Sequence, residues 1–352
     1  MSRNIGADPL DRTRYPIDEW ALREVRYDGG DLGKTETLFA VANGYLGLRG
    51  NLEEGRDAYA HGTFVNGFHE VWPIHHAEDA YGFAKVGQTI VNVPDVKTMR
   101  LYVDDEPLLL SSADLESYER TLDFRTGLLT RDVVWRTPAG KRVHIRSRRM
   151  VSFTQRHLAV MDYEVTLLDA DAALAMSCQI LNRQDGEDEY HVPAAAMGEG
   201  FDPRRAASLT ERVLQPQLHW SEGDRSALGY RVTASGMTLG VAADHTIETT
   251  DPYTSETKVA EDLVKRTFQV SGTKGTTTRF TTMAAYHTSR GVPPVELVER
   301  CERTLDRAGA MGVQELHAEQ AAWLTDFWLR SDVEIGGDPG LQQAVRWNVF
   351  HL

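Results

Sequence analysis

The stretch from Gly127 to Asp169 reads GLLTRDVVWRTPAGKRVHIRSRRMVSFTQRHLAVMDYEVTLLD, and its pattern decides the fold that we predict. It holds three runs rich in valine, isoleucine, phenylalanine and tyrosine. Pro138-Ala139-Gly140 separates the first two runs, and the polar Thr154-Gln155-Arg156 separates the last two. Apolar runs of this kind, divided by turn residues, are typical of neighbouring strands. We therefore predict a three-stranded antiparallel meander.

The middle run of this stretch alternates between apolar and basic residues. Val143, Ile145 and Ser147 share one face, and the opposite face carries Arg142, His144, Arg146 and Arg148. A period of two predicts a strand with one face in water. The basic face could bind phosphate. Because the formal charge of the chain is -14, we favour a solvated face that nearby acids balance.

Further short apolar runs follow, each bounded by Gly, Pro, Asp or Ser. They are Leu174 to Leu181, Val213 to Trp220, Tyr230 to Ser235, Met237 to Ala243, Leu263 to Ser271 and Thr277 to His287. Helical periods do not interrupt them, so the pattern indicates a large antiparallel β-sandwich rather than a doubly wound sheet. The polar stretch from Gln184 to Arg205 is too long for a hairpin turn, and we predict a mobile loop or a lid there.

After Pro293-Pro294 the apolar period becomes helical. Val298, Cys301 and Leu305 form a short stripe, and a longer one comprises Val313, Leu316, Gln320, Trp323, Leu324 and Phe327. The stretch from Gly309 to Gly312 separates the two stripes. We predict two helices that act as a connector.

The last fifteen residues, DPGLQQAVRWNVFHL, predict a third helix. Asp338 is a good N-cap and Pro339 suits the first helical position. One face of this helix would carry Leu341, Val345, Asn348, Val349 and Leu352. A left-handed cap, a following proline and a closing basic cluster are all missing. We interpret the helix either as a fraying terminal helix or as the start of a further domain.

Composition limits the classes of function. At 352 residues, with 41% hydrophobic and 26% charged residues, the chain can bury a sizeable core. Its negative charge argues against general binding of nucleic acid or anionic membranes. Cys178 and Cys301 lie far apart, so neither a disulfide framework nor a thiolate metal site is indicated. The N-terminus lacks an apolar signal segment, and we expect a cytoplasmic protein.

The segment GFHEVWPIHHAEDAYG concentrates groups that bind metals or sugars, namely His69, Glu70, Trp72, His75, His76, Glu78, Asp79 and Tyr81. Zinc needs imidazoles on a fixed face, and Pro73 interrupts any helix here, so we do not predict a metal site. Pyranose rings stack on aromatic side chains, while carboxylates and imidazoles bond their hydroxyls. A loop that rims a sugar pocket and an ordinary surface loop both remain open.

Two other motifs give little indication of a binding or catalytic site. NGYLGLRGN holds Gly44, Gly47 and Gly50, but this spacing matches neither a dinucleotide fingerprint nor a Walker loop. Tight turns and close backbone packing explain the glycines better. The sequence also lacks a G-x-S-x-G nucleophile elbow. Taken by themselves, the residues locate no catalytic centre.

Four segments together resemble the N-terminal half of glycoside hydrolase family 65. They are ETLFAVANGYLGLRGNLEEG at Glu36 to Gly55, GTFVNGFHEVWP at Gly62 to Pro73, Gly127 to Phe153 of the opening stretch, and the final QQAVRWNVFHL. That family comprises inverting phosphorylases of maltose, trehalose, kojibiose and related α-glucosides, with some hydrolases. The resemblance covers nearly the whole chain and is weakest in the polar stretch after Gln184.

The resemblance implies a domain plan. Residues 1–290 would form a galactose mutarotase-like supersandwich, 291–336 a helical linker, and 337–352 the first helix of an (α/α)6 barrel. In this plan the general acid and the phosphate-binding residues lie beyond Leu352, so this chain holds no catalytic residue. The resemblance implies no metal and no cofactor, inorganic phosphate and an α-glucoside disaccharide as substrates of the longer enzyme, and a homodimer. His69, Glu70 and Trp72 are our candidates for the substrate rim.

Two alternatives do not need a barrel. One is a free-standing carbohydrate-binding module, in which the terminal helices pack on a sheet. The other is a sugar epimerase of the mutarotase type, which needs a histidine acid and a glutamate base in one cleft. A reading frame that ends naturally after Leu352 would favour both alternatives over the phosphorylase interpretation.

Overall fold

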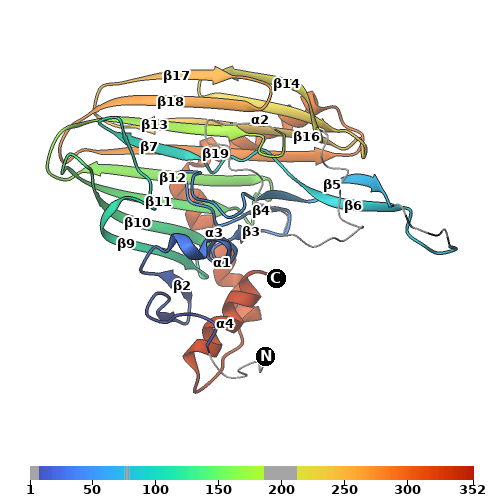
Figure 1. Ribbon diagram of the computed structural model, residues 1–352, viewed down its shortest axis with the longest axis horizontal. Coiled ribbons are helices and arrows are strands. Elements are labelled where there is room, and N and C mark those ends of the chain that lie inside the picture. The colour runs from blue at the N-terminus through green and yellow to red at the C-terminus, as the bar shows by residue number, and fades with distance from the viewer. Residues whose placement is uncertain (1–7, 75, 77, 79, 186–211) are drawn as a thin grey trace.

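The computed structural model describes residues 8–74, 76, 78, 80–185 and 212–352. The chain folds mainly into β-structure: antiparallel sheets of ten, five and four strands form the body, and long helices follow at the C-terminal end (Figure 1). The predicted large antiparallel sandwich is confirmed. The polar stretch predicted as a loop or lid lies, except for Gln184 and Asp185, outside the described residues.

The meander predicted from the opening stretch is present. Strand β10 (Leu128–Arg136) pairs antiparallel with β11 (Arg142–Val151), which pairs antiparallel with β12 (Leu158–Leu167). On the outer face of β11, Arg148 Nη2 lies 2.8 Å from Glu164 Oε1. This contact supports the interpretation of a basic strand face that acids on neighbouring strands balance.

The meander forms the middle of the ten-stranded sheet. From one edge to the other, its order is β1-β2-β9-β10-β11-β12-β19-β16-β15-β14. The strands outside the meander are β1 (Ile17–Asp18), β2 (Ala21–Glu24), β9 (Asp114–Asp123), β19 (Thr277–Ser289), β16 (Thr238–Glu248), β15 (Arg225–Val232) and β14 (Leu214–Glu222). Because β12 pairs with β19, segments more than a hundred residues apart lie side by side.

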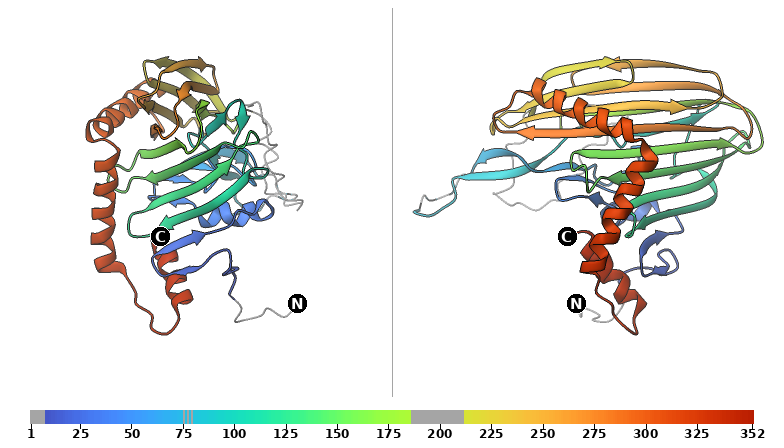
Figure 2. Two further views of the ribbon diagram at one scale, coloured as in Figure 1. Left: turned by 90° about the vertical axis from the view of Figure 1, so that its left-hand side faces the viewer. Right: turned by 180° about the vertical axis from the view of Figure 1, so that it is seen from behind.

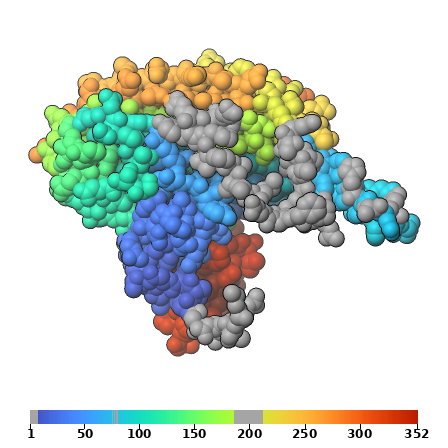
Figure 3. Space-filling model, in the orientation of Figure 1, coloured from blue at the N-terminus to red at the C-terminus, as the bar shows by residue number. Residues whose placement is uncertain are grey.

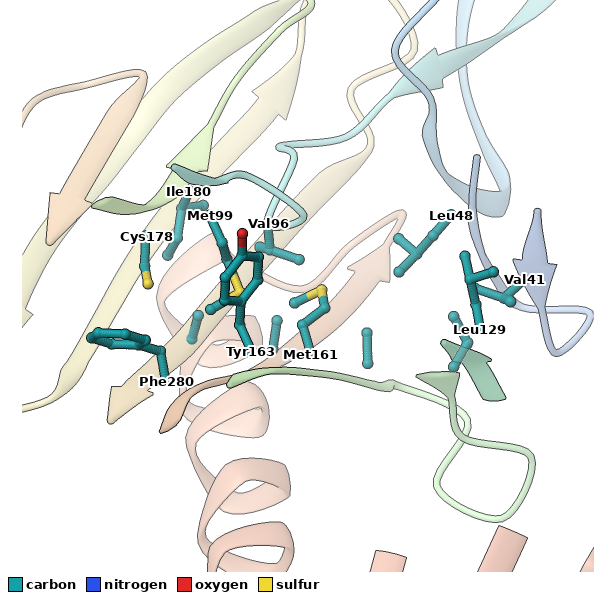
Figure 4. Close-up of a cluster of buried hydrophobic side chains, with 14 of the residues drawn as sticks. Val41, Leu48, Val96, Met99, Leu129, Met161, Tyr163, Cys178, Ile180 and Phe280 are labelled. Atoms are coloured by element: carbon teal, nitrogen blue, oxygen red, sulfur yellow. The ribbon is translucent and has the colours of Figure 1, made fainter. Parts of the chain in front are cut away.

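The second layer is the five-stranded sheet, ordered β17-β18-β13-β7-β8. Its strands are β17 (Tyr253–Val259), β18 (Leu263–Gly272), β13 (Ala172–Leu181), β7 (Met99–Val103) and β8 (Glu106–Pro107). Tyr163 and Phe280 of the ten-stranded sheet meet Cys178 and Ile180 of the five-stranded sheet in one buried core (Figure 4). Burying this apolar surface is the main stabilising term of the sandwich.

The third sheet closes one side of the same core. It is ordered β3-β4-β5-β6, with β3 (Val41–Ala42), β4 (Leu46–Leu48), β5 (Thr63–Pro73) and β6 (Val86–Asn92), and it follows a short 3-10 turn η1 (Gly29–Asp31) and helix α1 (Leu32–Leu38). Gly44 has φ +80, and a Cβ atom on Gly50 would lie 2.8 Å from the carbonyl carbon of Phe39. The glycines therefore serve turns and close backbone packing, as the sequence indicated.

Helices α2 (Pro294–Met311) and α3 (Val313–Ser331) run along the outside of the ten-stranded sheet (Figure 2). The stripe Val298, Cys301 and Leu305 is buried against that sheet, as predicted. We expected a break over four residues, but α2 continues to Met311 and only Gly312, at φ +80, interrupts the helices. In the described part of the chain, no helix has the length and apolar character needed to cross a membrane.

Helix α4 (Pro339–Phe350) begins as predicted, because the carboxylate of Asp338 accepts a hydrogen bond from the backbone N–H of Leu341 at 3.0 Å. The predicted apolar stripe is not the face that packs on the rest of the chain. The residues that α4 buries are Gln342, Gln343, Arg346 and Phe350, whereas Leu341 is 49% exposed. The polar side chains are buried because they find partners in other segments. Gln342 Nε2, for example, donates to the carbonyl of Val333 at 2.9 Å.

Two other predictions about the sheets need correction. The strand expected from Tyr230 to Ser235 ends at Val232, because Gly236 at φ +67 returns the chain into β16. Strands before Gly127, such as β7 and β9, were not predicted, and neither was β17. Its sequence YTSETKV has few apolar residues, and its side chains are almost all exposed at the edge of a sheet.

Candidate functional site

The β5–β6 hairpin, called the arm below, carries all three residues proposed for a substrate rim. It extends beyond the body of the sandwich, on the right in Figures 1 and 3. His69 pairs with Ile90 and Trp72 pairs with Gly87 in an antiparallel register. The segment that we predicted as a loop is therefore a strand as far as Pro73. Proline is tolerated at this last position, since β4 pairs with β5 only from Thr63 to Val65 and leaves Pro73 on a strand edge.

His69 lies half-buried near the base of the arm. Its Nδ1 lies 2.8 Å from the carbonyl oxygen of Gly67, which has φ +79. The register of the two strands shifts between Phe64 and His69. Such an irregularity bends the strand and changes the direction of its side chains. The contact with Gly67 fixes the imidazole at this bend.

Glu70 is almost completely buried, at 4% exposure. Its carboxylate accepts hydrogen bonds from the backbone N–H groups of Ser235 at 2.7 Å, Ala234 at 3.0 Å and Val71 at 2.8 Å. Ala234 and Ser235 belong to the turn between β15 and β16. Glu70 therefore joins the base of the arm to the main sandwich.

Trp72 is half-buried on the same strand. Its indole Nε1 donates to Thr89 Oγ1 at 3.0 Å. The ring covers the backbone of Gly87 so closely that a Cβ atom there would lie 2.5 Å from it. Gly87 is thus required for the position of the indole ring.

The structure does not bring the three candidates onto one face. Successive side chains of a strand point to opposite faces, so His69 shares a face with Val71, and Glu70 shares the other face with Trp72. The sequence could not reveal this, because we treated the segment as a loop.

A metal centre does not form from these residues in the part of the chain that is described: no group of three or more metal-binding side chains comes together there. His76 contacts the carbonyl of Ala84 at 2.8 Å through Nε2. His75 and Asp79, which we also considered as ligands, lie outside the described residues.

The inner face of the ten-stranded sheet carries a buried network of charged side chains. We did not predict this network from the sequence. Arg131 Nη1 and Nη2 donate to the two carboxylate oxygens of Glu54 at 2.8 and 2.6 Å. Arg149 Nη2 donates to Glu53 Oε1 at 2.8 Å. Burial alone would raise the pKa of Glu53, but the nearby guanidinium groups lower it to about 2. The signal in the sequence was an arginine at position 131, where the alternation calls for an apolar residue.

The other buried carboxylates are also held by donors. Glu24 accepts from Arg14 at 2.5 Å, Glu36 accepts from Arg49 at 3.0 Å, and Asp95 accepts from Lys97 at 2.7 Å. Burial alone would raise the pKa of Asp95, but Lys97 and Arg183 hold it well below its usual range. These acids therefore stabilise the fold.

Comparison with known protein families assigns this architecture to one of them. Residues 22–327 match the N-terminal domain of glycosyl hydrolase family 65. The chain belongs to glycoside hydrolase family 65. The recognition made from four sequence segments is therefore confirmed.

The family 65 chain is similar to longer proteins. A glycosyl hydrolase of Mycobacterium tuberculosis H37Rv is 36% identical over 338 residues, which are 96% of this chain and 42% of that protein. An α,α-trehalose phosphorylase of Thermoanaerobacter brockii is 31% identical over 342 residues, which are 96% and 43% of the two chains. A solved structure described as a kojibiose phosphorylase from the human microbiome shares the fold, with TM-score 0.80 at 17% identity over 96% and 42% of the two chains. The family 65 chain thus spans less than half the length of these relatives.

Helices α3 and α4 of this family 65 chain present apolar side chains to solvent. Trp323 is 38% exposed and Leu329 is 80% exposed. Trp323 stacks on Phe153, with ring centroids 4.6 Å apart, and on Phe327 at 5.6 Å. Trp323 therefore extends a row of aromatic rings to the surface of α3.

Proposed function

We propose that this chain is the N-terminal, non-catalytic domain of an enzyme that cleaves α-glucosidic disaccharides by inverting phosphorolysis or hydrolysis. Family membership over residues 22–327 is the observation that carries the proposal. Relatives named as trehalose, maltose and kojibiose phosphorylases support an α-glucoside as the substrate and phosphate as the attacking group.

The chemistry of the reaction supports a non-catalytic role. An inverting glycosidase uses one carboxylic acid to protonate the leaving oxygen and a second carboxylate to activate water. A phosphorylase uses phosphate as the nucleophile and needs only the acid. The buried carboxylates described above all accept hydrogen bonds from arginine, lysine or backbone donors. We therefore assign the acid to polypeptide outside this chain.

We propose that the chain contributes positioning instead. In this proposal His69 and Trp72 present polar and aromatic groups at the rim of the sugar pocket, and Glu70 holds the arm at the correct angle through the β15–β16 turn. The exposed rings of α3 would pack against the catalytic domain. In this proposal the domains are residues 1–290 for the sandwich, 291–336 for the linker and 337–352 for the first helix of the barrel.

The homodimer and the cytoplasmic location belong to the same proposal. A carbohydrate-binding module and a mutarotase-type epimerase are not favoured by a specific observation. For the epimerase, the required histidine and glutamate would have to share a cleft, and His69 and Glu70 lie on opposite faces of β5.

An activity assay tests the proposal. The 352-residue chain, incubated with orthophosphate and maltose or trehalose, should release no glucose 1-phosphate, whereas a longer polypeptide that contains it should. In the longer protein, Trp72→Ala should raise KM for the disaccharide more than it lowers kcat, because the change affects substrate positioning rather than the acid. Release of glucose 1-phosphate by the short chain would refute the assignment of the acid.

A further inference from the structure

Strand β6 (Val86–Asn92) forms one edge of the four-stranded sheet, and β5 is its only described neighbour. It runs along the arm, which extends beyond the body of the sandwich (Figure 1). The side chains of Val86 and Ile90 are 59% and 51% exposed. This edge of the sheet is therefore accessible to another strand.

The backbone hydrogen bonds of the arm show which residues of β6 face outward. The N–H of Ile74 donates to the carbonyl of Lys85 at 3.0 Å, and the register from there to Ile90 is continuous. Because the backbone groups of successive residues in an antiparallel strand point to alternate sides, those of Val86, Gln88 and Ile90 point away from β5. In the part of the chain that the structure describes, they bond to no other segment. They are available to hydrogen-bond a further strand.

The other edges of the three sheets are protected against pairing, whereas β6 is not. Strands β1, β3 and β8 are each 2 residues long. Strand β14 contains Pro216 beside a shift in register, and β17 carries Glu256 and Lys258. Short edges, proline, bulges and charges are the devices that prevent edge strands from pairing. Strand β6 reads VGQTIVN, with 7 residues, no proline and no charge, so it is the described edge that is best suited to accept another strand.

We propose that β6 pairs antiparallel with β6 of a second copy of this chain, across a two-fold axis. The pairing rests on the homodimer of the proposed function and specifies where its subunits meet. In this register Gln88 lies opposite Gln88 of the partner subunit, and Val86 lies opposite Ile90 of the partner subunit. The strand is self-complementary about Gln88, as a two-fold interface requires.

Both faces of the joined strands suit this register. On one face, the β-branched side chains of Val86 and Ile90 lie opposite each other across the axis, and such cross-strand pairs stabilise a sheet. On the other face, Gly87 lies opposite Thr89 of the partner subunit. Like charges do not meet across the axis, since β6 has no charged residue. A neutral and self-complementary edge favours a second copy of the chain over a charged partner.

Disulfide trapping tests this proposal in the 352-residue chain. Residues of a hydrogen-bonded antiparallel pair have Cα atoms about 5.5 Å apart, within the range of about 4.4–6.8 Å that a disulfide spans. Gln88→Cys should therefore form a disulfide-linked dimer under mild oxidation. Cys178 and Cys301 are buried, so the linkage reports on the introduced thiol. A single strand pair is only a marginal contact, and the covalent link captures it even where the dimer is a minor species.

Matched controls separate strand pairing from random collision. Gln217→Cys places a thiol at an exposed glutamine of the edge strand β14, beside Pro216. Gln88→Cys should yield about tenfold more linked dimer than Gln217→Cys, because pairing raises the effective concentration of one thiol at the other. Adding Ile90→Lys to Gln88→Cys should return the yield to that of the control, since lysine on an edge strand opposes pairing.

A mixture of Val86→Cys and Ile90→Cys chains tests the register. The mixed dimer should link, whereas each variant alone should not, because its two thiols would lie about 13 Å apart along the strands. The proposal is overturned if Gln88→Cys links no better than Gln217→Cys, if Ile90→Lys leaves the yield of Gln88→Cys unchanged, or if Val86→Cys alone links as well as the mixture. These outcomes do not depend on the release of glucose 1-phosphate, so failure of the pairing is distinct from failure of the proposed function.

Discussion

Gln343 in helix α4 donates a hydrogen bond from Nε2 to the backbone carbonyl of Ala21 in strand β2 at 2.7 Å, across 322 positions of the chain. Its Oε1 accepts from Arg12 Nη1 at 2.6 Å. Both the nitrogen and the oxygen of this buried side-chain amide therefore have hydrogen-bond partners. Beside it, Arg346 binds both carboxylate oxygens of Asp332 at 2.8 Å. The last helix is attached to the first strands by polar contacts rather than by an apolar stripe.

Replacing Gln343 by leucine should destabilise the fold. The leucine leaves the carbonyl of Ala21 buried without a donor, and an unsatisfied buried group of this kind costs about 1–3 kcal/mol. Urea unfolding monitored by tryptophan fluorescence measures the loss. Asn348→Ala, on the exposed face of the same helix, should stay within about 0.5 kcal/mol of the unaltered chain. Equal stability of the two variants would contradict the structural role of Gln343.

Removing Arg131 should have a larger effect. The side chain is buried and binds both Glu53 and Glu54, so Arg131→Met leaves two carboxylates in the core with one cation fewer. Breaking a buried ion pair in this way costs about 3–5 kcal/mol. Arg136→Met is the matched control, because Arg136 is an arginine on the same strand whose ion pairs are exposed, and such pairs contribute about 0–1 kcal/mol. Denaturant midpoints of the two variants should therefore differ clearly.

These contacts explain which parts of the fold the sequence could predict. The meander was predictable because the period of Val143 and Ile145 is local and does not depend on a partner. The contact face of α4 was not predictable, since the burial of Gln343 depends on Ala21 near the opposite end of the chain. The arm was missed as a strand because its pairing with β6 overrides the weak strand propensity of His69, Glu70 and Pro73.

Stability should fall as the pH drops from 6.5 toward 4.5, before most carboxylates titrate. His245 is fully buried in β16, where its Nδ1 contacts Thr282 Oγ1 at 2.9 Å, and burial lowers its pKa from 6.5 to about 3. Below pH 6.5 the unfolded chain binds a proton that the folded chain does not, so protonation favours unfolding. One such histidine contributes a slope of up to about 1.4 kcal/mol per pH unit.

His245→Asn should reduce that slope between pH 6.5 and 4.5, as measured by urea unfolding at each pH. The unaltered chain, measured in parallel, gives the reference slope. Glu53 affects the pH dependence of stability only at lower pH. Its pKa is lowered from 4.5 to about 2, so its stabilisation is complete above pH 4.5 and is lost as the pH falls toward 2. A slope in His245→Asn that equals the slope of the unaltered chain would exclude His245 as its source.

The exposed apolar surface on α3 and α4 should make the isolated chain self-associate. Leu329 and Leu341 are 80% and 49% exposed, and apolar area that leaves water on association contributes about 25 cal/mol per Å². The double variant Leu329→Lys/Leu341→Lys should bind less hydrophobic dye and remain monomeric at higher concentration in analytical ultracentrifugation. Val295→Lys is the control, because Val295 is an equally exposed apolar residue at the start of α2, away from this surface. If the unaltered chain is strictly monomeric and binds no dye, the two helices do not form an interaction face.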